Sequence, residues 1–566
     1  MCVQPPMFPF CIHGGPAAGS AADVSFLNAR PAGADGFVRV EQGQFVTDKG
    51  VVRFSGVNLT GPANFPSHDD ASNLADALSR YGINGVRLHF ADVAGDYSNF
   101  MLSGEPCLVE EGSTVECFEF NSVQLDKFEF LVSELKKRGV YVDLNLHVGR
   151  FHNRLGARKG ATLYDEALIA SQKEYARRLL NHVNPYTGLA WKDDAALAIV
   201  EIANEDSIFR PWGPEFAWVK GADEPFKKFL LKVEKSFYAE MRRFLVEDVG
   251  VKCAIAGSQL CASPFEVQQM FDVTIDNRYW CHPHNAGSPE WSFVDAPLAD
   301  FANGAGDPLA LMAKEKMPDR AFVVTEYGHP YPNSFGCETL PLLGAAATVG
   351  GWSGIFAYSF AHRAAPLPEY VPFFFTIGER ADVLCHQPAV SVMFRTLGGM
   401  PRDSFVLECG NPGEGYALFA SPEVKFFSGW TDGRCFDLGD GIALSFKGQE
   451  NAFATVSLLR REGGWLVAAT SSGKNTGTRL TEVGRTPENY PVLAGRGGNW
   501  GNAPILYAGV EAELSVGCGK GPVSCHALNG NGLERAEVCV RRTGAGAVTI
   551  RLAPSCRTLW YLIRLA

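Results

Sequence analysis

Residues 195–206, with the sequence AALAIVEIANED, form an apolar run that ends abruptly in an amide and two carboxylates. Such a run is typical of a strand that is buried on both faces of a parallel sheet. In parallel α/β folds, the side chains that carry chemistry gather at the carboxyl ends of the strands. Asn204 and Glu205 are therefore candidate site residues.

Helix-like and strand-like segments alternate on both sides of this stretch. Helical spacing of apolar residues predicts helices over 67–81, 122–138, 163–182, 225–247, 267–270 and 388–397. Short apolar runs predict strands near 54–58, 85–90, 140–147, 195–203, 252–257, 273–276, 320–326 and 354–360. This alternation predicts an α/β fold, a (β/α)8 TIM barrel with enlarged loops. A doubly wound open sheet is the alternative, but no glycine-rich phosphate-binding motif follows the first strand.

The chain of 566 residues is too long for one hydrophobic core. We expect an N-terminal extension over 1–36, the barrel over 37–400, and a C-terminal antiparallel β-sandwich domain over 401–566. Short β-rich runs separated by Gly, Asn and Pro, such as 416–419 and 559–563, favour the sandwich. Because no flexible linker follows residue 399, we expect the sandwich to pack on the barrel.

Composition narrows the classes of partner. Hydrophobic residues make up 46% and charged residues 20% of the chain, and no continuous apolar stretch is long enough for a membrane span. The net charge of -11, without clustered Lys and Arg, argues against binding of nucleic acid. The sequence thus predicts neither a membrane nor a nucleic acid as partner, and it favours a neutral or weakly polar ligand.

The N-terminus and the cysteines bear on the compartment. Residues 1–19 have no Lys or Arg before their short apolar stretch, unlike a secretory signal. The protein is therefore expected to stay inside the cell, or to have had a leader that is absent from this chain. The 15 cysteines lack zinc-like spacing and favour mostly reduced, buried thiols. Cys107 and Cys117 bracket one loop and could pair in an oxidising compartment.

Side-chain parity places polar residues on one surface of the barrel. Residues two apart on a strand share a face, so Glu205 lies on the face of Glu201, and Arg87 on that of His89. The opposite parity is aliphatic and would face the outer helices. Glu326 gives a second carboxylate on a nonadjacent strand. Glycoside hydrolysis requires two such carboxylates, one protonated to assist the leaving group and one ionised.

The order of these motifs resembles the clan A retaining glycoside hydrolases, most closely family five, the cellulase- and mannanase-like enzymes, over about residues 45–400. The resemblance rests on Arg87, His147, the pair Asn204-Glu205, the aromatic-rich segment 279–284 and Glu326. It implies that Glu205 is the general acid/base and Glu326 the nucleophile. A nearby arginine lowers the pKa of a carboxyl group, and the like charge keeps the other protonated. No cofactor is implied.

The resemblance also implies a set of substrate-binding residues. Asn204 would bind the sugar 2-hydroxyl, and Arg87 would hold Glu326 ionised. His147 and one strand-six side chain would bind sugar or carboxylate, and the strand-six position stays open among Tyr279, His282 and His284. Many relatives have a tryptophan at the end of strand eight, where this chain has Tyr358. The full candidate set is Asn204, Arg87, His147, Tyr279, His282, His284, Tyr358, Trp212 and Trp291.

Other polar residues have plainer interpretations. Glu201, deep in its strand, is predicted to be the buried partner of an arginine rather than a catalyst. His89 and His152 are predicted to form hydrogen bonds without a catalytic role. Cys281, His282 and His284 could suggest a metal, but a fourth ligand is missing from the loop, so no metal is predicted.

These observations predict a retaining β-glycoside hydrolase that cleaves O-glycosidic bonds of a β-linked oligo- or polysaccharide by double displacement. Glucan- or mannan-type substrates are favoured, and a carbohydrate is the expected partner. The alternatives are a catalytically inactive carbohydrate-binding barrel and an exo-acting β-galactosidase-like enzyme. The long loop 91–119 and the loops after strands four and six would decide between endo and exo action. Retention predicts carboxyl groups about 5–5.5 Å apart.

Overall fold

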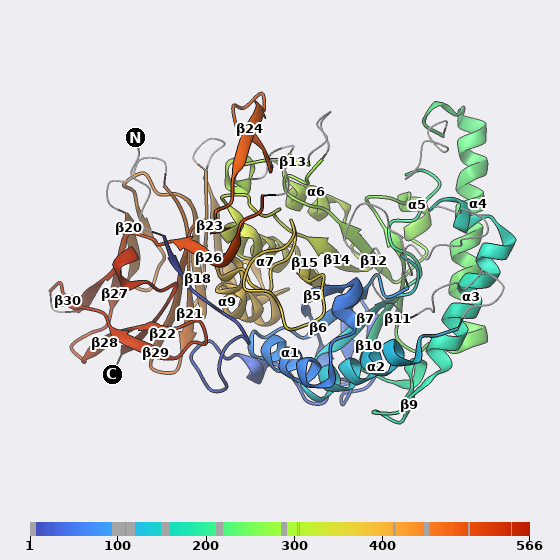
Figure 1. Ribbon diagram of the computed structural model, residues 1–566, viewed down its shortest axis with the longest axis horizontal. Coiled ribbons are helices and arrows are strands. Elements are labelled where there is room, and N and C mark those ends of the chain that lie inside the picture. The colour runs from blue at the N-terminus through green and yellow to red at the C-terminus, as the bar shows by residue number, and fades with distance from the viewer. Residues whose placement is uncertain are drawn as a thin grey trace.

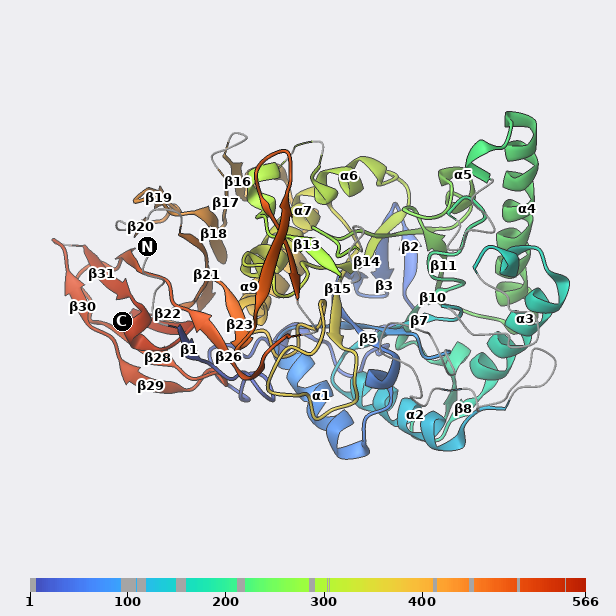
Figure 2. The ribbon, with the colours of Figure 1, turned by 45° about the horizontal axis from the view of Figure 1, so that its top comes forward.

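The computed structural model describes residues 7–92, 108, 119–148, 159–210, 219–284, 291–302, 304, 306–410, 415–446, 452–495, 499–544 and 546–565. Figure 1 shows two regions side by side: a barrel surrounded by helices, and a set of antiparallel sheets that carries the C-terminus. Figure 2, turned by 45°, shows the same arrangement, with the orange-red hairpin of β24 (Leu480–Arg485) and β25 (Pro491–Gly495) standing beside β13 (Ser292–Val294).

Eight parallel strands close into a barrel in the order β5–β6–β7–β10–β11–β12–β14–β15, and β15 pairs back onto β5. Closure excludes the open doubly wound sheet and confirms the predicted (β/α)8 fold. The strands are β5 (Phe54–Thr60), β6 (Gly85–His89), β7 (Tyr141–Asn145), β10 (Leu197–Glu201), β11 (Ala254–Gln259), β12 (Val273–Asn277), β14 (Ala321–Tyr327) and β15 (Gly354–Ala361).

Helices cover the outside of the barrel. Several begin at a side chain that accepts a backbone hydrogen bond, such as Ser67 before the first helix and Asp223 before the fourth. The long predicted helices are confirmed to within a few residues. The helices are α1 (His68–Arg80), α2 (Ser122–Lys137), α3 (Glu166–Asn181), α4 (Glu224–Arg243), α5 (Phe265–Gln268), α6 (Pro308–Glu315), α7 (Thr339–Gly350), α8 (Ala381–Leu384) and α9 (Gln387–Val392).

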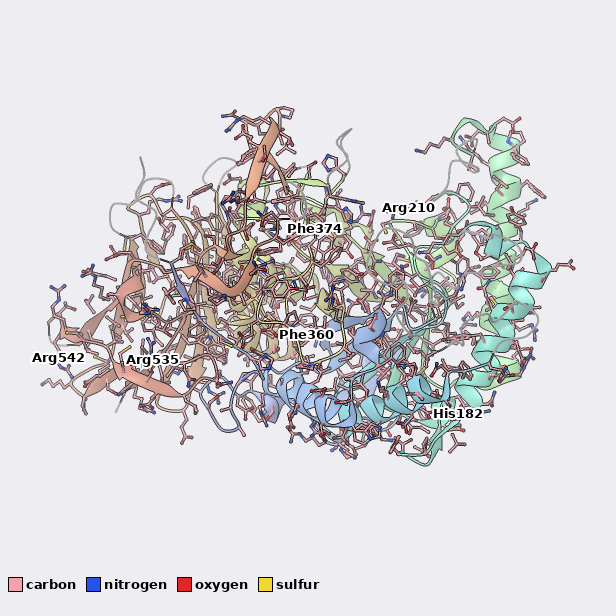
Figure 3. All side chains as sticks on the ribbon, in the orientation of Figure 1. His182, Arg210, Phe360, Phe374, Arg535 and Arg542 are labelled. Carbon is pink, nitrogen blue, oxygen red and sulfur yellow. The ribbon has the colours of Figure 1, made fainter. Side chains whose placement is uncertain are left out.

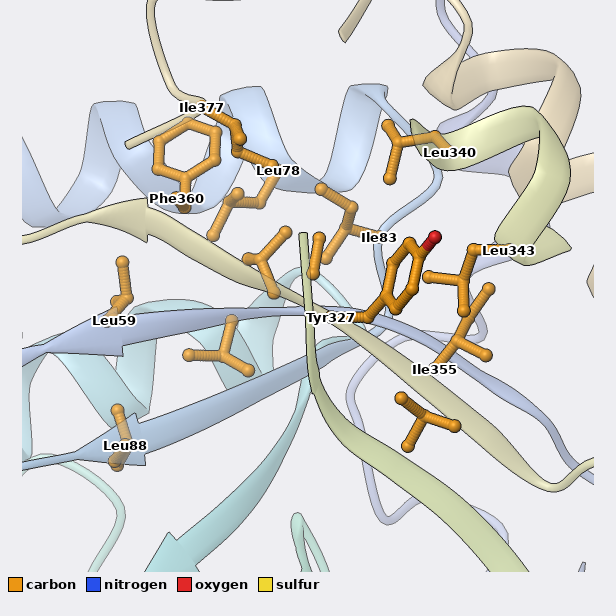
Figure 4. Close-up of a cluster of buried hydrophobic side chains, with 14 of the residues drawn as sticks. Leu59, Leu78, Ile83, Leu88, Tyr327, Leu340, Leu343, Ile355, Phe360 and Ile377 are labelled. Atoms are coloured by element: carbon orange, nitrogen blue, oxygen red, sulfur yellow. The ribbon is translucent and has the colours of Figure 1, made fainter. Parts of the chain in front are cut away.

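The barrel strands bury two apolar surfaces. Inside the barrel, side chains such as Phe54, Ile199 and Phe356 form a closed core. Outside it, Leu59 and Leu88 belong to the core that packs against α1 and α7, as Figure 4 shows for the strands and the helix side chains around them. The aliphatic parity of the sequence thus faces the helices as expected, and the polar parity is left for the interior.

The C-terminal region is a β-sandwich, as predicted. An eight-stranded sheet β16–β17–β18–β21–β22–β32–β28–β29 faces a five-stranded sheet β19–β20–β27–β31–β30 across a core that includes Phe427, Trp465 and Ile550. The strands are β16 (Val406–Cys409), β17 (Tyr416–Ala420), β18 (Val424–Trp430), β19 (Cys435–Asp437), β20 (Ile442–Phe446), β21 (Phe453–Arg461), β22 (Gly464–Thr470), β27 (Ala512–Gly517), β28 (Val523–Leu528), β29 (Glu534–Glu537), β30 (Val540–Arg542), β31 (Ala547–Leu552) and β32 (Trp560–Leu565).

Smaller sheets join the N-terminal segment and the barrel loops to the C-terminal region. The N-terminal β1 pairs with β26, and β13, from the loop after β12, pairs with β25 of the β24–β25 hairpin. The domain boundaries at 36 and 400 stay predictions. These strands are β1 (Met7–Pro9), β2 (Arg39–Glu41), β3 (Gln44–Thr47), β4 (Gly50–Val51), β8 (Val183–Asn184), β9 (Leu189–Ala190), β13 (Ser292–Val294), β23 (Gly473–Thr476), β24 (Leu480–Arg485), β25 (Pro491–Gly495) and β26 (Asn502–Ala508).

The cysteines differ in part from the expectation. All the described cysteines are free thiols, but only Cys253, Cys337, Cys385 and Cys525 are buried, and the others are half-buried or exposed. The suggested pair, Cys107 and Cys117, lies outside the described residues. Among the helices of the described part, none combines the length and apolar character needed to cross a membrane.

The barrel and the sandwich share a buried contact that leads to a prediction. His386 is fully buried, and its two ring nitrogens hydrogen-bond the hydroxyls of Ser457 and Thr470 at 2.8 and 2.6 Å. Trp560 Nε1 donates to the carbonyl of Cys385 at 2.9 Å. A chain truncated after Gly399 loses these partners and exposes the apolar face around them, so we expect it to aggregate. Solubility and dye binding measure this, and a soluble, cooperatively unfolding 1–399 chain would contradict it.

Candidate active site

Arg87, on β6, is fully buried inside the barrel. Its Nε and Nη2 atoms donate to the two carboxylate oxygens of Glu201, each at 2.7 Å. Nη1 donates to Glu326 Oε1 at 2.7 Å and to Asn58 Oδ1 at 3.1 Å, and Nη2 donates to Asn204 Oδ1 at 2.8 Å. Because a guanidinium can only donate, every partner is an acceptor. One side chain therefore ties together residues of β5, β10 and β14 and of the segment after β10.

Glu326, near the end of β14, is surrounded by donors. Besides Arg87, the hydroxyl of Tyr279 donates to Glu326 Oε2. His89 Nδ1 donates to Asn145 Oδ1 at 3.2 Å, so the Nε2 atom of a neutral His89 ring, 3.4 Å from Glu326 Oε1, has no hydrogen to donate. The residue Glu326 as a whole is only 5% exposed to solvent. Hydrogen bonds of this kind favour the ionised carboxylate and fix its orientation.

Glu205 faces a different environment. Asn277 Nδ2 donates to Glu205 Oε1 at 2.9 Å, and the Arg210 guanidinium lies farther away, 3.6 Å from Oε2. Asn277 stands beside Glu326 in the pairing of β12 with β14, which places these contacts at one end of the barrel. The separation of the two carboxyl groups stays a prediction.

The backbone at Glu205 adopts a conformation that side-chain-bearing residues rarely use. Its φ of 47° lies in the left-handed region, which costs free energy outside glycine. Neighbouring groups hold the turn in place. The Glu205 N–H donates to the side-chain oxygen of Gln259, the Asn204 N–H donates to the carbonyl of His147 at 2.8 Å, and Lys159 Nζ donates to the Asn204 carbonyl at 2.6 Å.

Burial is the largest influence on the pKa values of Glu326, His89 and Tyr279. Burial raises the pKa of Glu326, and the charge of Glu205 raises it further, while Arg87 and Tyr279 lower it. The expected lowering by Arg87 is thus present but is outweighed by burial. Burial, together with the charge of Arg87, also holds the pKa of His89 well below its ordinary value, so His89 is neutral. The pKa of Tyr279 is raised well above its usual range by burial and by Glu326.

His147 lies between Asp92 and Asp206, beside the segment that follows Glu205. Its Nδ1 is 3.7 Å from Asp92 Oδ2, and its Nε2 is 3.9 Å from Asp206 Oδ2. Asp206 also accepts from Gly160 N–H at 2.6 Å and from the hydroxyl of Thr162. The contacts of Asp206 anchor the segment after Glu205 to the loop after β7. His147, which lies next to Asp206, therefore supports the turn at Glu205.

The structure distinguishes the strand-six candidates. Tyr279 is the residue that hydrogen-bonds Glu326. His282 packs edge-on against Tyr279, with ring centroids 5.1 Å apart, and contacts the Pro283 carbonyl at 2.7 Å through Nδ1. His284 is exposed and lies at an isolated bridge with Ser292. Tyr279 therefore takes the position that the sequence left open.

Aromatic side chains form one wall next to these residues. Tyr358 packs edge-on against His89, Tyr279 and Phe375, and its peptide bond to Ser359 is cis. In Figure 3, Phe374 lies toward the C-terminal sheets, whereas Arg210 lies toward α4.

Trp291 immediately precedes β13 and is 37% exposed. Trp212 and His152 lie outside the described residues.

The structure adds residues that sequence reasoning did not single out. Asn58 and Asn277 bind Arg87 and Glu205, respectively, and Asn145 donates to Glu201 at 2.9 Å. Their signal was present, since each is a polar residue within an apolar barrel strand. Glu201 and His89 behave as the plain interpretation predicted, as an arginine partner and a hydrogen-bonding residue. Within the described residues, no group of three or more His, Cys, Asp or Glu side chains could hold a metal ion.

Comparisons with known proteins give a consistent but distant picture. No family model matches the chain. The mannan endo-1,4-beta-mannosidase 4 of rice (Oryza sativa subsp. japonica) is 27% identical over 207 residues, which cover 33% of this chain and 42% of that protein. The chain thus matches less than half the length of this relative. The expected resemblance to glycoside hydrolases is thus found in sequence as a distant similarity to a mannan endo-1,4-beta-mannosidase.

Solved structures of related shape include two mannanases. The endo-beta-1,4-mannanase of Thermotoga petrophila is 13% identical, covers 74% of this chain and 97% of its own, and has a TM-score of 0.47. The endo-1,4-beta-mannanase of Rhizomucor miehei is 15% identical, covers 57% and 90%, and has a TM-score of 0.43.

The buried Arg87 cluster predicts a large, pH-dependent loss of stability for Arg87→Met. Methionine fills much of the space but leaves Glu201 and Glu326 without their cation, which typically costs about 3–5 kcal/mol. At acidic pH, protonation of Glu326, whose pKa burial raises, reduces this cost, so the difference from the wild type should shrink. Denaturant unfolding at pH 7 and pH 4 measures it. Arg39→Met, which removes an exposed pair with Asp48, is the control and should leave the midpoint unchanged. Equal midpoints for Arg87→Met and the wild type at pH 7 would contradict this account.

Proposed function

We propose that the protein is a retaining β-glycoside hydrolase that cleaves β-linked oligo- or polysaccharides, with mannan-type substrates favoured. The observation that carries the proposal is the pair Glu205, in the segment after β10, and Glu326, near the end of β14. They are joined by hydrogen bonds through Arg87, Asn204 and Asn277. The sequence similarity to a rice mannan endo-1,4-beta-mannosidase supports the mannan preference. Glucan-type substrates stay within the proposal because the carboxylate pair does not select the sugar.

Glu326 is the proposed nucleophile. The donors on both of its oxygens, Arg87 on Oε1 and Tyr279 on Oε2, hold the carboxylate in one orientation and favour its ionised form. In the first step it attacks the anomeric carbon and forms a glycosyl ester, while Glu205 gives its proton to the leaving oxygen.

Glu205 is the proposed acid/base. In the second step it accepts a proton from water, which attacks the anomeric carbon and releases Glu326. Its carboxyl oxygens contact Asn277 Nδ2 at 2.9 Å and the Arg210 guanidinium at 3.6 Å. The strained turn at Glu205, held by Gln259 and Lys159, fixes where the carboxyl group lies.

Asn204 is the proposed ligand of the sugar 2-hydroxyl. Because Arg87 can only donate, the amide oxygen of Asn204 must face it, at 2.8 Å. The amide nitrogen is thereby turned the other way, and no partner in the described part of the chain accepts from it. A donor fixed beside the two carboxylates can strengthen its bond to the 2-hydroxyl as the transition state forms.

The assignment of Glu205 predicts that its loss depends on the leaving group. A good leaving group needs no proton, so Glu205→Ala should spare the first step for activated aryl glycosides far more than for unactivated glycosides. The second step then limits turnover, and azide should accelerate it by replacing water. Steady-state turnover of an activated and an unactivated substrate with the same sugar, with and without azide, measures this.

Glu326→Ala is the matched comparison. It removes the nucleophile and should lower turnover of both substrates by several orders of magnitude, with little dependence on the leaving group. Equal losses for both substrates in Glu205→Ala, without an effect of azide, would show that Glu205 is not the acid/base.

The stereochemical outcome is a separate prediction. Double displacement through Glu326 inverts the anomeric carbon twice, so the first-formed sugar should keep the β configuration. Proton NMR of the early product, recorded before mutarotation, measures this. An α product at the first time point would mean that water attacks directly and that Glu326 is not a nucleophile.

A further inference from the structure

Asn475 and Trp500 connect the C-terminal region to the loop that follows β15. Asn475, on β23, is 2% exposed, and its side chain spans both backbone groups of Val371 in the loop after β15. Its Oδ1 accepts from Val371 N–H at 2.9 Å, and its Nδ2 donates to the Val371 carbonyl at 2.9 Å. The same nitrogen donates to the Trp500 carbonyl at 2.8 Å. A buried amide with these contacts fixes the loop and the tryptophan relative to each other.

Trp500 packs on aromatic residues of this loop and of the loop after β14. Its ring meets Phe374 edge-on, with centroids 4.6 Å apart, and stacks on Tyr331 at 5.8 Å. Phe375, the next residue, packs on Tyr279 at 4.6 Å. Tyr279 in turn donates its hydroxyl to Glu326. Phe374, Phe375, Tyr279 and Trp500 belong to one apolar cluster, which we call the aromatic wall.

The backbone of the loop is also tied to the barrel on either side. The Ser359 N–H donates to the Phe375 carbonyl at 2.7 Å, and the Tyr331 N–H donates to the Phe374 carbonyl. The Tyr331 hydroxyl accepts from the Asn475 N–H at 2.6 Å. The wall therefore has few alternative arrangements, provided that Trp500 fills its outer side.

We propose that Trp500, held by Asn475, is a positioning residue for the active site. It holds Phe374 in place and thereby keeps the adjoining Phe375 against Tyr279, so that the Tyr279 hydroxyl stays aligned with Glu326. The C-terminal region then takes part in assembling the site as well as covering the barrel. The inference rests on the proposed function only in assigning Glu326 as the nucleophile.

This role has a measurable electrostatic consequence. The hydrogen bond from Tyr279 lowers the pKa of Glu326, against the effect of burial. If the wall relaxes and the bond is lost, the pKa of Glu326 rises. Glu326 must be ionised to attack, so the acidic limb of the kcat/KM profile moves to higher pH.

Trp500→Ala in the full-length chain tests the proposal. We expect kcat/KM for an aryl β-glycoside to fall by about 10- to 100-fold, as misplacement of catalytic groups does, with the acidic limb displaced to higher pH. Trp500→Phe, which keeps an aromatic ring against Phe374, should restore most of the rate and the original limb. An unchanged acidic limb in Trp500→Ala would overturn the proposal.

Trp430→Ala is the matched control. Trp430 is also a half-buried tryptophan of the C-terminal region that packs on a barrel loop, through Phe335, but it belongs to a separate apolar cluster. It should reduce stability without moving the acidic limb. An equal displacement in Trp430→Ala would show a general structural effect and would overturn the specific role of Trp500.

Two further readouts separate this inference from the proposed function. In the Tyr279→Phe background, Trp500→Ala should cause no additional displacement of the limb, because the bond that it supports is already absent. A crystal structure of Trp500→Ala should show the Tyr279 hydroxyl out of hydrogen-bonding reach of Glu326. That contact can be measured whether or not the protein cleaves glycosides, and an unaltered contact would overturn the inference alone.

Discussion

A single buried guanidinium, that of Arg87, sets the geometry on which the rest of the site depends. Burying a cation is expensive unless every donor finds an acceptor, and the barrel supplies Glu201, Glu326, Asn204 and Asn58. Burial opposes the charge on Arg87, but Glu201 and Glu326 outweigh it and leave its pKa raised. The same hydrogen bonds orient three side chains: Glu326, the candidate nucleophile; Asn204, which precedes the candidate acid/base Glu205; and Glu201, which has a structural role.

The cluster also explains two carboxylates that take no direct part in the proposed reaction. Glu201 binds Arg87 through both oxygens, so Glu326 need not balance that charge alone. Asp143, beside Arg87 in the pairing of β6 with β7, is buried without a donor among the described residues. Burial and the charge of Glu201 raise the pKa of Asp143 well above its usual range, against the lowering effect of Arg87.

Much of the fold could be predicted because its signals are local. Apolar runs predicted strands at 85–90 and 320–326, and helical spacing of apolar residues predicted a helix at 122–138. All three elements are present, as β6, β14 and α2. The alternating parity of Arg87 and Leu88 indicated which side chains point inward. Pairing between segments far apart in the chain left no such signal, as in the contacts of β13 with β25 and of β1 with β26.

The residues of the candidate site also differ in whether a local sequence signal could predict them. Arg87, Glu205, Glu326 and Tyr279 could be named because each lies on a barrel strand or just after one, where a barrel gathers its polar groups. Which strand-six residue meets Glu326 depends on the loop path, and the sequence left it open. Trp500 could not be found in this way, since it reaches Phe374 only because the C-terminal strands fold back over the loop after β15.

The central claim is that Glu326 attacks the sugar and Glu205 assists it. A 2-deoxy-2-fluoro β-mannosyl fluoride tests this most directly, because the fluorine slows both steps while the good leaving group lets the first proceed. Mass spectrometry of the inactivated protein after proteolysis locates the trapped sugar. The account predicts one sugar per chain, as an ester on the peptide that contains Glu326. A protein that cleaves β-mannosides but carries the label on another residue, or carries none, would contradict it.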